Sequence, residues 1–276
     1  MIITDDFVMI NFPKTGSSFA RAAIKKLYSR RCSLGRKILS SIGLCNPGYI
    51  ELMLPNINNS THKFRHRHAK GQHGHVSQIP EKYRDRPIVS VVRNPFSRYV
   101  SGYKFKWWEK YPPQSDNVIV DAYPHFPNLS FEEFYNMKHE FGRENRLRGI
   151  EPKIELGIYS IQFIQFYCRN PAEVLNKIDD DYIEKELFRE DMGNIRFLRQ
   201  ENLRQDLKAF LLDVGASIEE VNFLDFMEKV NITKRTQPGD GDGDGDGDDT
   251  HIDSEIKNRI LARDRLIFKI FPEYAD

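Results

Sequence analysis

The first apolar run of the chain is a short strand pattern that leads into a helix pattern. Phe7 to Phe12 (FVMINF) is rich in β-forming residues and is bounded by Pro13, as expected for a buried strand. Lys14 to Ser18 contains a glycine and two serines that can cap a helix. Apolar residues then recur at roughly helical spacing, at Phe19, Ala22, Ala23 and Leu27. The segment predicts a strand, a tight turn and a helix.

A second segment repeats this order. Ile88 to Val92 (IVSVV) is a mostly apolar run typical of a buried strand, and Arg93 follows it directly. From Pro95 onward, aromatic and aliphatic side chains recur at helical spacing as far as Trp107. Two strand–turn–helix units favour a parallel α/β sheet, which binds ligands beyond the carboxyl ends of its strands.

The remaining pattern adds mostly helices, and it predicts a single domain over residues 1–276. Helical spacing predicts helices at Phe131 to Phe141, Ile158 to Tyr167, Asn202 to Val214 and Ser254 to Phe271. Asn194 to Leu198 is expected to form a further strand. The proline-rich stretch Tyr111 to Asn128 is expected to be a long loop that could close over a substrate.

Composition narrows the class of protein. With 276 residues and 39% hydrophobic content, the chain can bury one sizeable core. Three widely spaced cysteines argue against a disulfide scaffold or a zinc cluster. There is no apolar run of about 18 residues and no basic start of a signal peptide. We therefore expect a cytoplasmic protein with no membrane span.

The net charge of +1 conceals an uneven distribution. Gly239 to Asp249 alternates glycine with six aspartates and is expected to be a flexible loop. Without those six charges the rest of the chain stands at +1 + 6 = +7, so anionic ligands are plausible. Asp242 to Asp253 also matches part of a calcium-binding EF-hand loop, but Pro238 would spoil the entering helix. Calcium binding therefore stays open.

Residues 13–19 (PKTGSSF) form the first chemical signal. A glycine allows a tight turn whose N–H groups point inward, and the following helix adds the positive end of its dipole. Lys14 contributes a full positive charge, while Thr15, Ser17 and Ser18 contribute hydroxyl groups. The segment is not a complete Walker A motif, because GxxxxGK[ST] is absent. It predicts a cradle for phosphate or sulfate, and a capped turn with a surface lysine is the simpler interpretation.

Residues 93–103 (RNPFSRYVSGY) form the second signal. Arg93 at a strand end and Ser101 two helical turns later could both face a second phosphate group. A capped helix with a surface ion pair is the alternative for this segment alone.

Together, the strand–PKTGSS–helix and strand–RNPFSRYVSGY–helix segments resemble the two nucleotide motifs of sulfotransferases that use 3′-phosphoadenosine 5′-phosphosulfate (PAPS), especially the carbohydrate (Golgi-type) branch. The resemblance implies a P-loop-like three-layer α/β fold, with a central parallel sheet flanked by helices. It also implies that the first motif holds the phosphosulfate and that Arg93 and Ser101 hold the 3′-phosphate. The residues implied for the phosphosulfate are Lys14, Thr15, Gly16, Ser17, Ser18 and Phe19.

Two further stretches extend the resemblance. KGQHGHVS (residues 70–77) is similar to the His-Gly-His-Val-Ser segment of heparan sulfate 2-O-sulfotransferases, where the second histidine is the catalytic base. This implies His75 as the base here, with His73 second and a carboxylate as a further alternative. TKRT (residues 233–236) is similar to another donor-contacting stretch, which implies donor contacts for Arg235 and Thr236. The resemblance is strongest over residues 7–19 and 70–103.

These signals predict in-line transfer of a sulfuryl group to a hydroxyl, or less readily an amine, of an acceptor. Lys14 would stabilise the leaving oxygen, and lysine and arginine would neutralise the donor without a metal ion. The acceptor is expected to be a carbohydrate or a small metabolite, with no nucleic acid as partner. Two other functions remain open: a P-loop kinase of small molecules, and a non-catalytic module that binds nucleotides or polyanions through His62 to His75.

Overall fold

The computed structural model describes residues 1–33, 35, 48–55, 70–228 and 252–275. The chain forms two compact units, each assembled from three separate stretches. The first unit comprises Met1–Asn56, Lys70–Arg93 and Asn194–Ile232; the second comprises Ile57–Ala69, Asn94–Gly193 and Thr233–Asp276. The single domain expected from the sequence stays a prediction.

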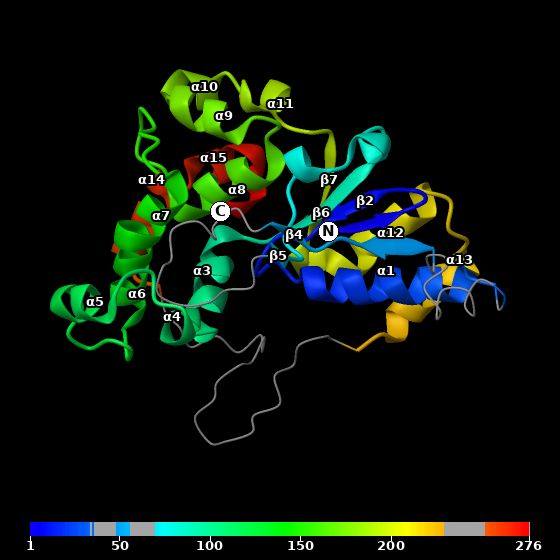
Figure 1. Ribbon diagram of the computed structural model, residues 1–276, viewed down its shortest axis with the longest axis horizontal. Helices are drawn as coiled ribbons and strands as arrows, with labels where there is room; N and C mark the ends of the chain where they lie inside the picture. The colour runs from blue at the N-terminus through cyan, green and yellow to red at the C-terminus, as the bar shows by residue number, and fades with distance from the viewer. Residues whose placement is uncertain (34, 36–47, 56–69, 229–251, 276) are drawn as a thin grey trace. The chain divides into compact units, whose positions relative to one another are not determined.

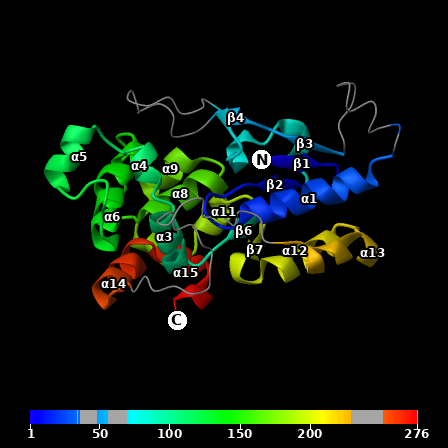
Figure 2. The ribbon, with the colours of Figure 1, turned by 90° about the horizontal axis from the view of Figure 1, so that it is seen from below.

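The first unit contains a five-stranded sheet in the order β3-β1-β2-β6-β7; Figure 1 labels β2, β6 and β7, and Figure 2 also labels β1 and β3. Its strands are β1 (Ile2–Thr4), β2 (Val8–Ile10), β3 (Tyr49–Glu51), β6 (Ile88–Val92) and β7 (Ile195–Arg199). Strands β2, β6 and β7 are parallel, with Val8 opposite Ile88 and Ile88 opposite Ile195. The expected α/β fold is confirmed: the sheet is mixed, its central strands are parallel, and helices flank it.

The edge of the sheet differs from the sequence prediction. Strand β1 was not predicted, and it pairs antiparallel with both β2 and β3. The turn between β1 and β2 is short, and such a connection can join only antiparallel strands. Thr4 closes it, because its hydroxyl donates to the carbonyl of Phe7 at 3.0 Å and accepts from the Phe7 N–H at 3.0 Å.

Helices α1 (Ser17–Arg31) and α12 (Leu203–Asp213) lie alongside the strands of this unit (Figures 1 and 2). One core joins them to the sheet; it includes Ala20, Ala23, Ile24, Leu27, Val89, Val91, Leu198, Leu207 and Phe210. The alanines let α1 approach the strands closely. The unit also contains α13 (Ile218–Val221), the short pair β4 (Leu54–Pro55) and β5 (Lys70–Gly71), and four 3₁₀ turns at Val76–Gln78, Glu81–Tyr83, Gln200–Asn202 and Asn222–Phe226.

The described part of the second unit is helical. Its helices are α3 (Pro95–Lys104), α4 (Trp107–Lys110), α5 (Asp116–Ala122), α6 (Phe131–Met137), α7 (Arg143–Leu147), α8 (Ile158–Tyr167), α9 (Pro171–Lys177), α10 (Asp180–Glu184), α11 (Phe188–Asp191), α14 (Ser254–Arg263) and α15 (Arg265–Ile270), with a final 3₁₀ turn at Pro272–Tyr274. Every residue of α8 is buried, and this helix contacts α7, α9 and α15. It is therefore the central helix of the unit's core.

Three sequence predictions in this unit were wrong in detail. The stretch Tyr111 to Asn128 is not a continuous loop, since its VIV run folds as α5 after Ser115. The helix expected over Phe131 to Phe141 changes to π-helical geometry at Lys138–Gly142. The terminal helix is interrupted at Asp264, whose carboxylate accepts hydrogen bonds from other helices.

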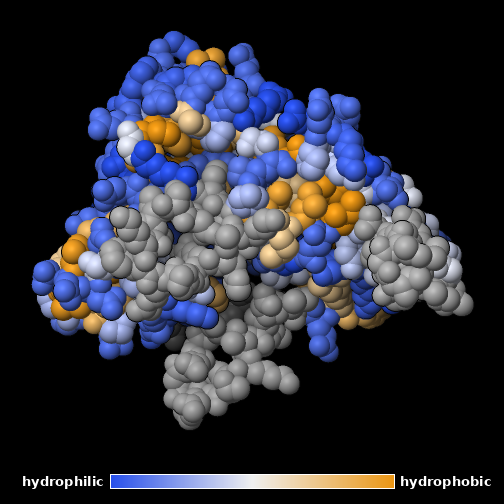
Figure 3. All heavy atoms as spheres, in the orientation of Figure 1, coloured by the Kyte–Doolittle hydropathy of each residue, from blue (hydrophilic) through white to orange (hydrophobic). Residues whose placement is uncertain are grey.

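The surface of the second unit carries some apolar side chains. Val118 and Val120 of α5 are each 44% exposed, and Figure 3 shows apolar surface over this helix. Within the described ranges, no helix is long and apolar enough to cross a membrane. The cytoplasmic location stays a prediction.

Candidate active site

The predicted anion cradle lies in the first unit, between the carboxyl end of β2 and the start of α1. Two of its residues have left-handed backbone geometry, Lys14 (φ 62°) and Gly16 (φ 79°). Gly16 is the N-cap of the 15-residue helix α1 and provides no side-chain cap. The first N–H groups of a helix have no intrahelical acceptor, so they and the helix dipole can bind an anion here.

Two cradle hydroxyls have a structural role. Thr15 and Ser17 are buried, and their hydroxyls donate to the carbonyl of Phe12 at 2.9 Å and 3.0 Å. A hydroxyl has a single proton to donate, so these two side chains anchor the loop to the end of β2. Thr15 and Ser17 can therefore contribute to anion binding only through their backbone N–H groups. The other two predicted residues of the cradle, Ser18 and Phe19, are half-buried.

Lys14 holds a strained conformation. A left-handed conformation costs an L-residue with a side chain roughly 1–2 kcal/mol. Such strain persists where the surrounding structure enforces it, and it is concentrated at functional sites. Here the enforcing contacts are the two anchored hydroxyls that follow Lys14 in the chain. The lysine is thus placed beside the helix N-terminus by the fold of the loop.

The second motif begins at the carboxyl end of the neighbouring strand. Since β2 and β6 are parallel, Arg93 at the end of β6 and the cradle at the end of β2 lie at the same edge of the sheet. Val89 and Val91 of β6 pack in the core that α1 and α12 share, and Arg93 follows the last residue of this strand. Ser101 belongs to the second unit, where it lies half-buried on α3. Asn94 caps that helix by accepting from the Phe96 N–H at 2.9 Å.

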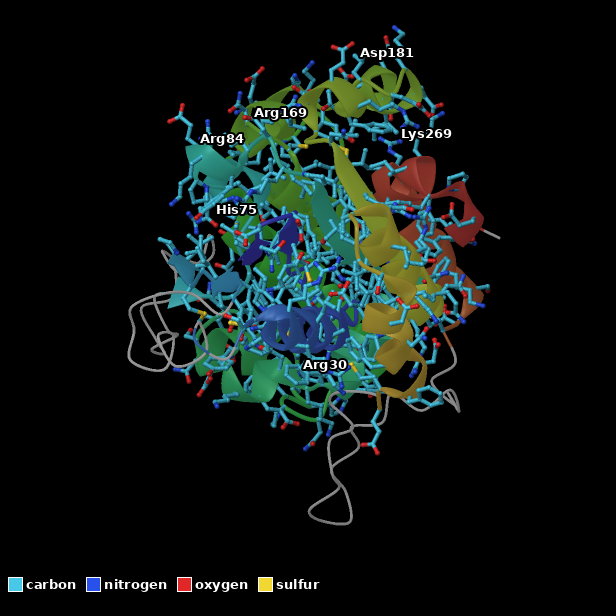
Figure 4. The ribbon with its side chains drawn as sticks, turned by 90° about the vertical axis from the view of Figure 1, so that its right-hand side faces the viewer. Arg30, His75, Arg84, Arg169, Asp181 and Lys269 are labelled. Carbon is cyan, nitrogen blue, oxygen red and sulfur yellow. The ribbon has the colours of Figure 1, made fainter. Side chains whose placement is uncertain are left out.

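The two candidate bases have different environments in the first unit. His75 is 5% exposed, and burial lowers the pKa of its imidazole to about 4. Its Nδ1 lies 2.8 Å from the hydroxyl of Ser77. Figure 4 shows His75 beside the N-terminal strands, while Arg30 projects from α1. His75 is therefore neutral near pH 7 but poorly exposed to an incoming acceptor.

His73 is half-buried, and its Nδ1 lies 2.8 Å from the backbone carbonyl of Asn11. A carbonyl oxygen only accepts, so Nδ1 carries the proton and Nε2 carries the lone pair of the neutral ring. This is the tautomer that a general base requires. Asn11 also donates from Nδ2 to the carbonyl of Gln72 at 3.1 Å, which fastens the histidine segment to the end of β2.

The structure adds residues that the sequence prediction missed. Asn11 was read only as part of a strand, although it follows β2 directly and holds the histidine segment. Gln200 follows β7 directly and lies against the cradle glycine. A Cβ built on Gly16 would be only 3.2 Å from the Cγ of Gln200. In the sequence, Gln200 could have been found by extending the strand–turn logic to the third parallel strand, since Val92 of β6 pairs with Arg199.

Some predicted site residues cannot be placed. Arg235, Thr236 and the Gly-Asp stretch 239–249 lie outside the described residues. Calcium binding by that stretch therefore stays open. In the part of the chain that the structure describes, no group of three or more His, Cys, Asp or Glu side chains could hold a metal ion.

The parallel strands β2, β6 and β7, the cradle at the start of α1 and Arg93 at the end of β6 together define an α/β protein with a candidate anion-binding site at the carboxyl ends of these strands. The chain matches the sulfotransferase family over residues 2–188. It belongs to this family and is therefore a transferase that acts on sulfuryl groups. No curated protein and no solved structure matches the chain.

Proposed function

We propose that the protein transfers the sulfuryl group of PAPS to a hydroxyl of a carbohydrate or small metabolite. The observation that carries this proposal is the cradle at Lys14–Ser18, where a lysine, a left-handed glycine and a helix N-terminus converge in a member of the sulfotransferase family. The preference for a carbohydrate rests on the similarity of residues 70–77 to heparan sulfate 2-O-sulfotransferases. The donor supplies the sulfuryl group and a good leaving phosphate.

In this proposal the acceptor oxygen bonds to sulfur while the bond from sulfur to the 5′-phosphate oxygen breaks. The acceptor proton passes to a base, and negative charge develops on the leaving oxygen. Lys14 and the cradle N–H groups stabilise that charge. Arg93 and Ser101 are assigned the 3′-phosphate, and Arg235 and Thr236 further donor contacts. No metal ion has a role in the proposed mechanism.

The proposed base is one of the two histidines, and the geometry favours His73 over the originally predicted His75. A base must reach the acceptor proton, and it works best with a pKa near the operating pH. Burial and a pKa of about 4 count against His75. His73 is more exposed, and the carbonyl of Asn11 sets its tautomer.

Thermal unfolding with different nucleotides tests the donor assignment. We expect 3′-phosphoadenosine 5′-phosphate (PAP) at about 100 times its Kd to raise the free energy of unfolding by roughly 2.7 kcal/mol. ADP and ATP, which lack the 3′-phosphate, should stabilise much less. Arg93→Ala should remove most of the PAP effect, because a charge-assisted contact to phosphate is lost. The exposed Arg84 is a matched control in the same unit, and Arg84→Ala should retain it.

Two other results would support the kinase or the polyanion-binding module instead of a sulfotransferase. Stabilisation by ATP rather than PAP would favour a small-molecule kinase. Binding of heparin that weakens steeply with salt, without any response to PAP, would favour a polyanion-binding module.

Gly16→Ala tests the cradle itself. The alanine would hold a left-handed conformation that costs about 1–2 kcal/mol of unfolding free energy. Its Cβ would also lie 3.2 Å from both Gln200 and Leu203, so the turn must shift and PAP should bind at least tenfold more weakly. Gly215 also has positive φ (91°), but no atom lies within 4 Å of an added Cβ. Gly215→Ala should therefore lose similar stability and keep its PAP affinity; equal losses of affinity would contradict the cradle assignment.

A further inference from the structure

A network of buried polar side chains connects helix α3 to other helices of the second unit through Tyr99, His139 and Asp264. Tyr99 of α3 is fully buried, and its hydroxyl donates to Oδ2 of Asp264 at 2.7 Å. Nε2 of His139 lies 2.9 Å from the same hydroxyl. Asp264 is also fully buried and lies between α14 and α15. The network therefore connects α3 with a segment 165 residues away in the chain.

Asp264 also holds the start of the central helix of the unit. Its Oδ1 accepts from the backbone N–H of Ser160, in the first turn of α8, at 2.7 Å. The fit is close, because a Cβ on Gly157 would collide with the same oxygen. One carboxylate thus joins α3, α8 and the junction of α14 and α15.

A neighbouring pair of contacts ties α3 to α8 a second time. The guanidinium of Arg98 is 2% exposed, donates to Oε1 of Gln162 at 2.5 Å and lies 4.0 Å from the ring centroid of Tyr159. The Tyr159 hydroxyl donates to the carbonyl of Arg98 at 3.1 Å. Burial lowers the pKa of Arg98 and raises the pKa of Asp264, so both charges carry a desolvation cost.

Helix geometry relates this network to the opposite face of α3. Successive residues of an α-helix are rotated by about 100°, so Ser97 and Ser101 lie on the side away from Tyr99. Both serines are half-buried. Tethers at Arg98 and Tyr99 therefore set the rotation of α3 about its axis, and this rotation determines where the Ser101 hydroxyl points.

We propose that Tyr99 and Asp264 are positioning residues that hold α3 in the orientation in which its Ser101 face receives the 3′-phosphate of the donor. The inference rests on the proposed function, because it takes α3 as the 3′-phosphate-binding helix. Hydrophobic residues of similar volume would hold these helices together without desolvating two charges. The hydrogen bonds of these buried charges are directional, so they restrict the rotation of α3 more narrowly than apolar packing alone would.

The test compares two ligands that differ in the 3′-phosphate alone, PAP and AMP, by calorimetry on the full chain. Tyr99→Phe keeps the buried ring and removes the hydroxyl that reaches Asp264. We expect PAP to bind about tenfold more weakly, the effect of roughly one buried hydrogen bond, while the Kd of AMP is unchanged. Asp264→Asn should act in the same direction. In turnover assays, the KM for PAPS should rise with little change in kcat.

Tyr103→Phe is the matched control. Tyr103 also lies on α3, and its hydroxyl donates to the carbonyl of Leu129 at 3.0 Å without reaching Asp264. It should retain the preference for PAP over AMP. If Tyr99→Phe retains that preference, or weakens both ligands equally, the positioning role is overturned. If Asp264→Asn does not fold, Tyr99→Phe alone decides. A wild-type protein without any preference for PAP would instead refute the proposed donor site, and this inference with it.

Discussion

Lys14→Gly should be a folded protein with a kcat lower by about 10²–10³, the typical loss when one donor to a developing oxyanion is removed. The proposed leaving oxygen gains negative charge as sulfur departs, and Lys14 is the cation of the cradle loop. The stability of this variant should hardly fall. Replacing Lys14 by glycine removes a left-handed strain at φ 62°, which should raise the free energy of unfolding by roughly 1–2 kcal/mol. The glycine also makes the unfolded chain more flexible, which should lower the free energy of unfolding by about 0.4–1 kcal/mol.

The measurement is the rate of PAP release from PAPS with a panel of saccharide acceptors, alongside a thermal unfolding curve. Lys26→Met, which changes an exposed lysine on α1, is the control for the rate and should leave it unchanged. Lys14→Arg keeps the positive charge and should retain much of the PAP affinity. A Lys14→Gly enzyme with a nearly normal rate would remove the leaving-group role from this lysine. A large loss of both stability and rate would contradict the strain argument.

His73→Asn should lower kcat by about 10²–10⁴, the range for loss of a general base. Asparagine can still donate to the carbonyl of Asn11 in place of Nδ1, so the histidine segment should keep its position at the end of β2. The side chain then has no basic nitrogen. Donor affinity, measured with PAP, should be unchanged because the cradle is untouched.

His75→Ala provides the contrast. Its imidazole is buried, so its removal should mainly lower stability through a cavity and a lost contact with Ser77. A large loss of kcat in His75→Ala with normal rates in His73→Asn would restore His75 as the base. Normal rates in both variants would direct attention to a carboxylate. His125 pairs with Glu133 and has a 74% exposed side chain, so His125→Asn is a suitable control.

The sequence predicted the parallel part of the fold because that signal is local. FVMINF and IVSVV are short apolar runs bounded by a proline or an arginine, and they form β2 and β6 within a few residues of the expected limits. The strand at Asn194 to Leu198 became β7, shifted by one residue. The antiparallel strand β1 was missed, because IIT is too short to show alternation and its pairing depends on a turn closed by Thr4.

The amino-acid sequence by itself also determined the chemistry of the candidate site. Residues 13–19 contain the glycine, the lysine and the helix start that an anion cradle needs, and Arg93 follows a strand that the pattern reveals. These features depend on neighbours in the chain, so a linear reading reaches them.

Only the tertiary structure decided which candidate side chains are buried or bonded to other parts of the protein. It directed the hydroxyls of Thr15 and Ser17 to Phe12, buried His75, and set the tautomer of His73 through Asn11. It also brought Asp264 to Tyr99 and Ser160, contacts that span 165 and 104 residues. Hydrogen bonds of this kind form between residues that are close in space but far apart in the sequence. No local pattern in the amino-acid sequence therefore predicts them.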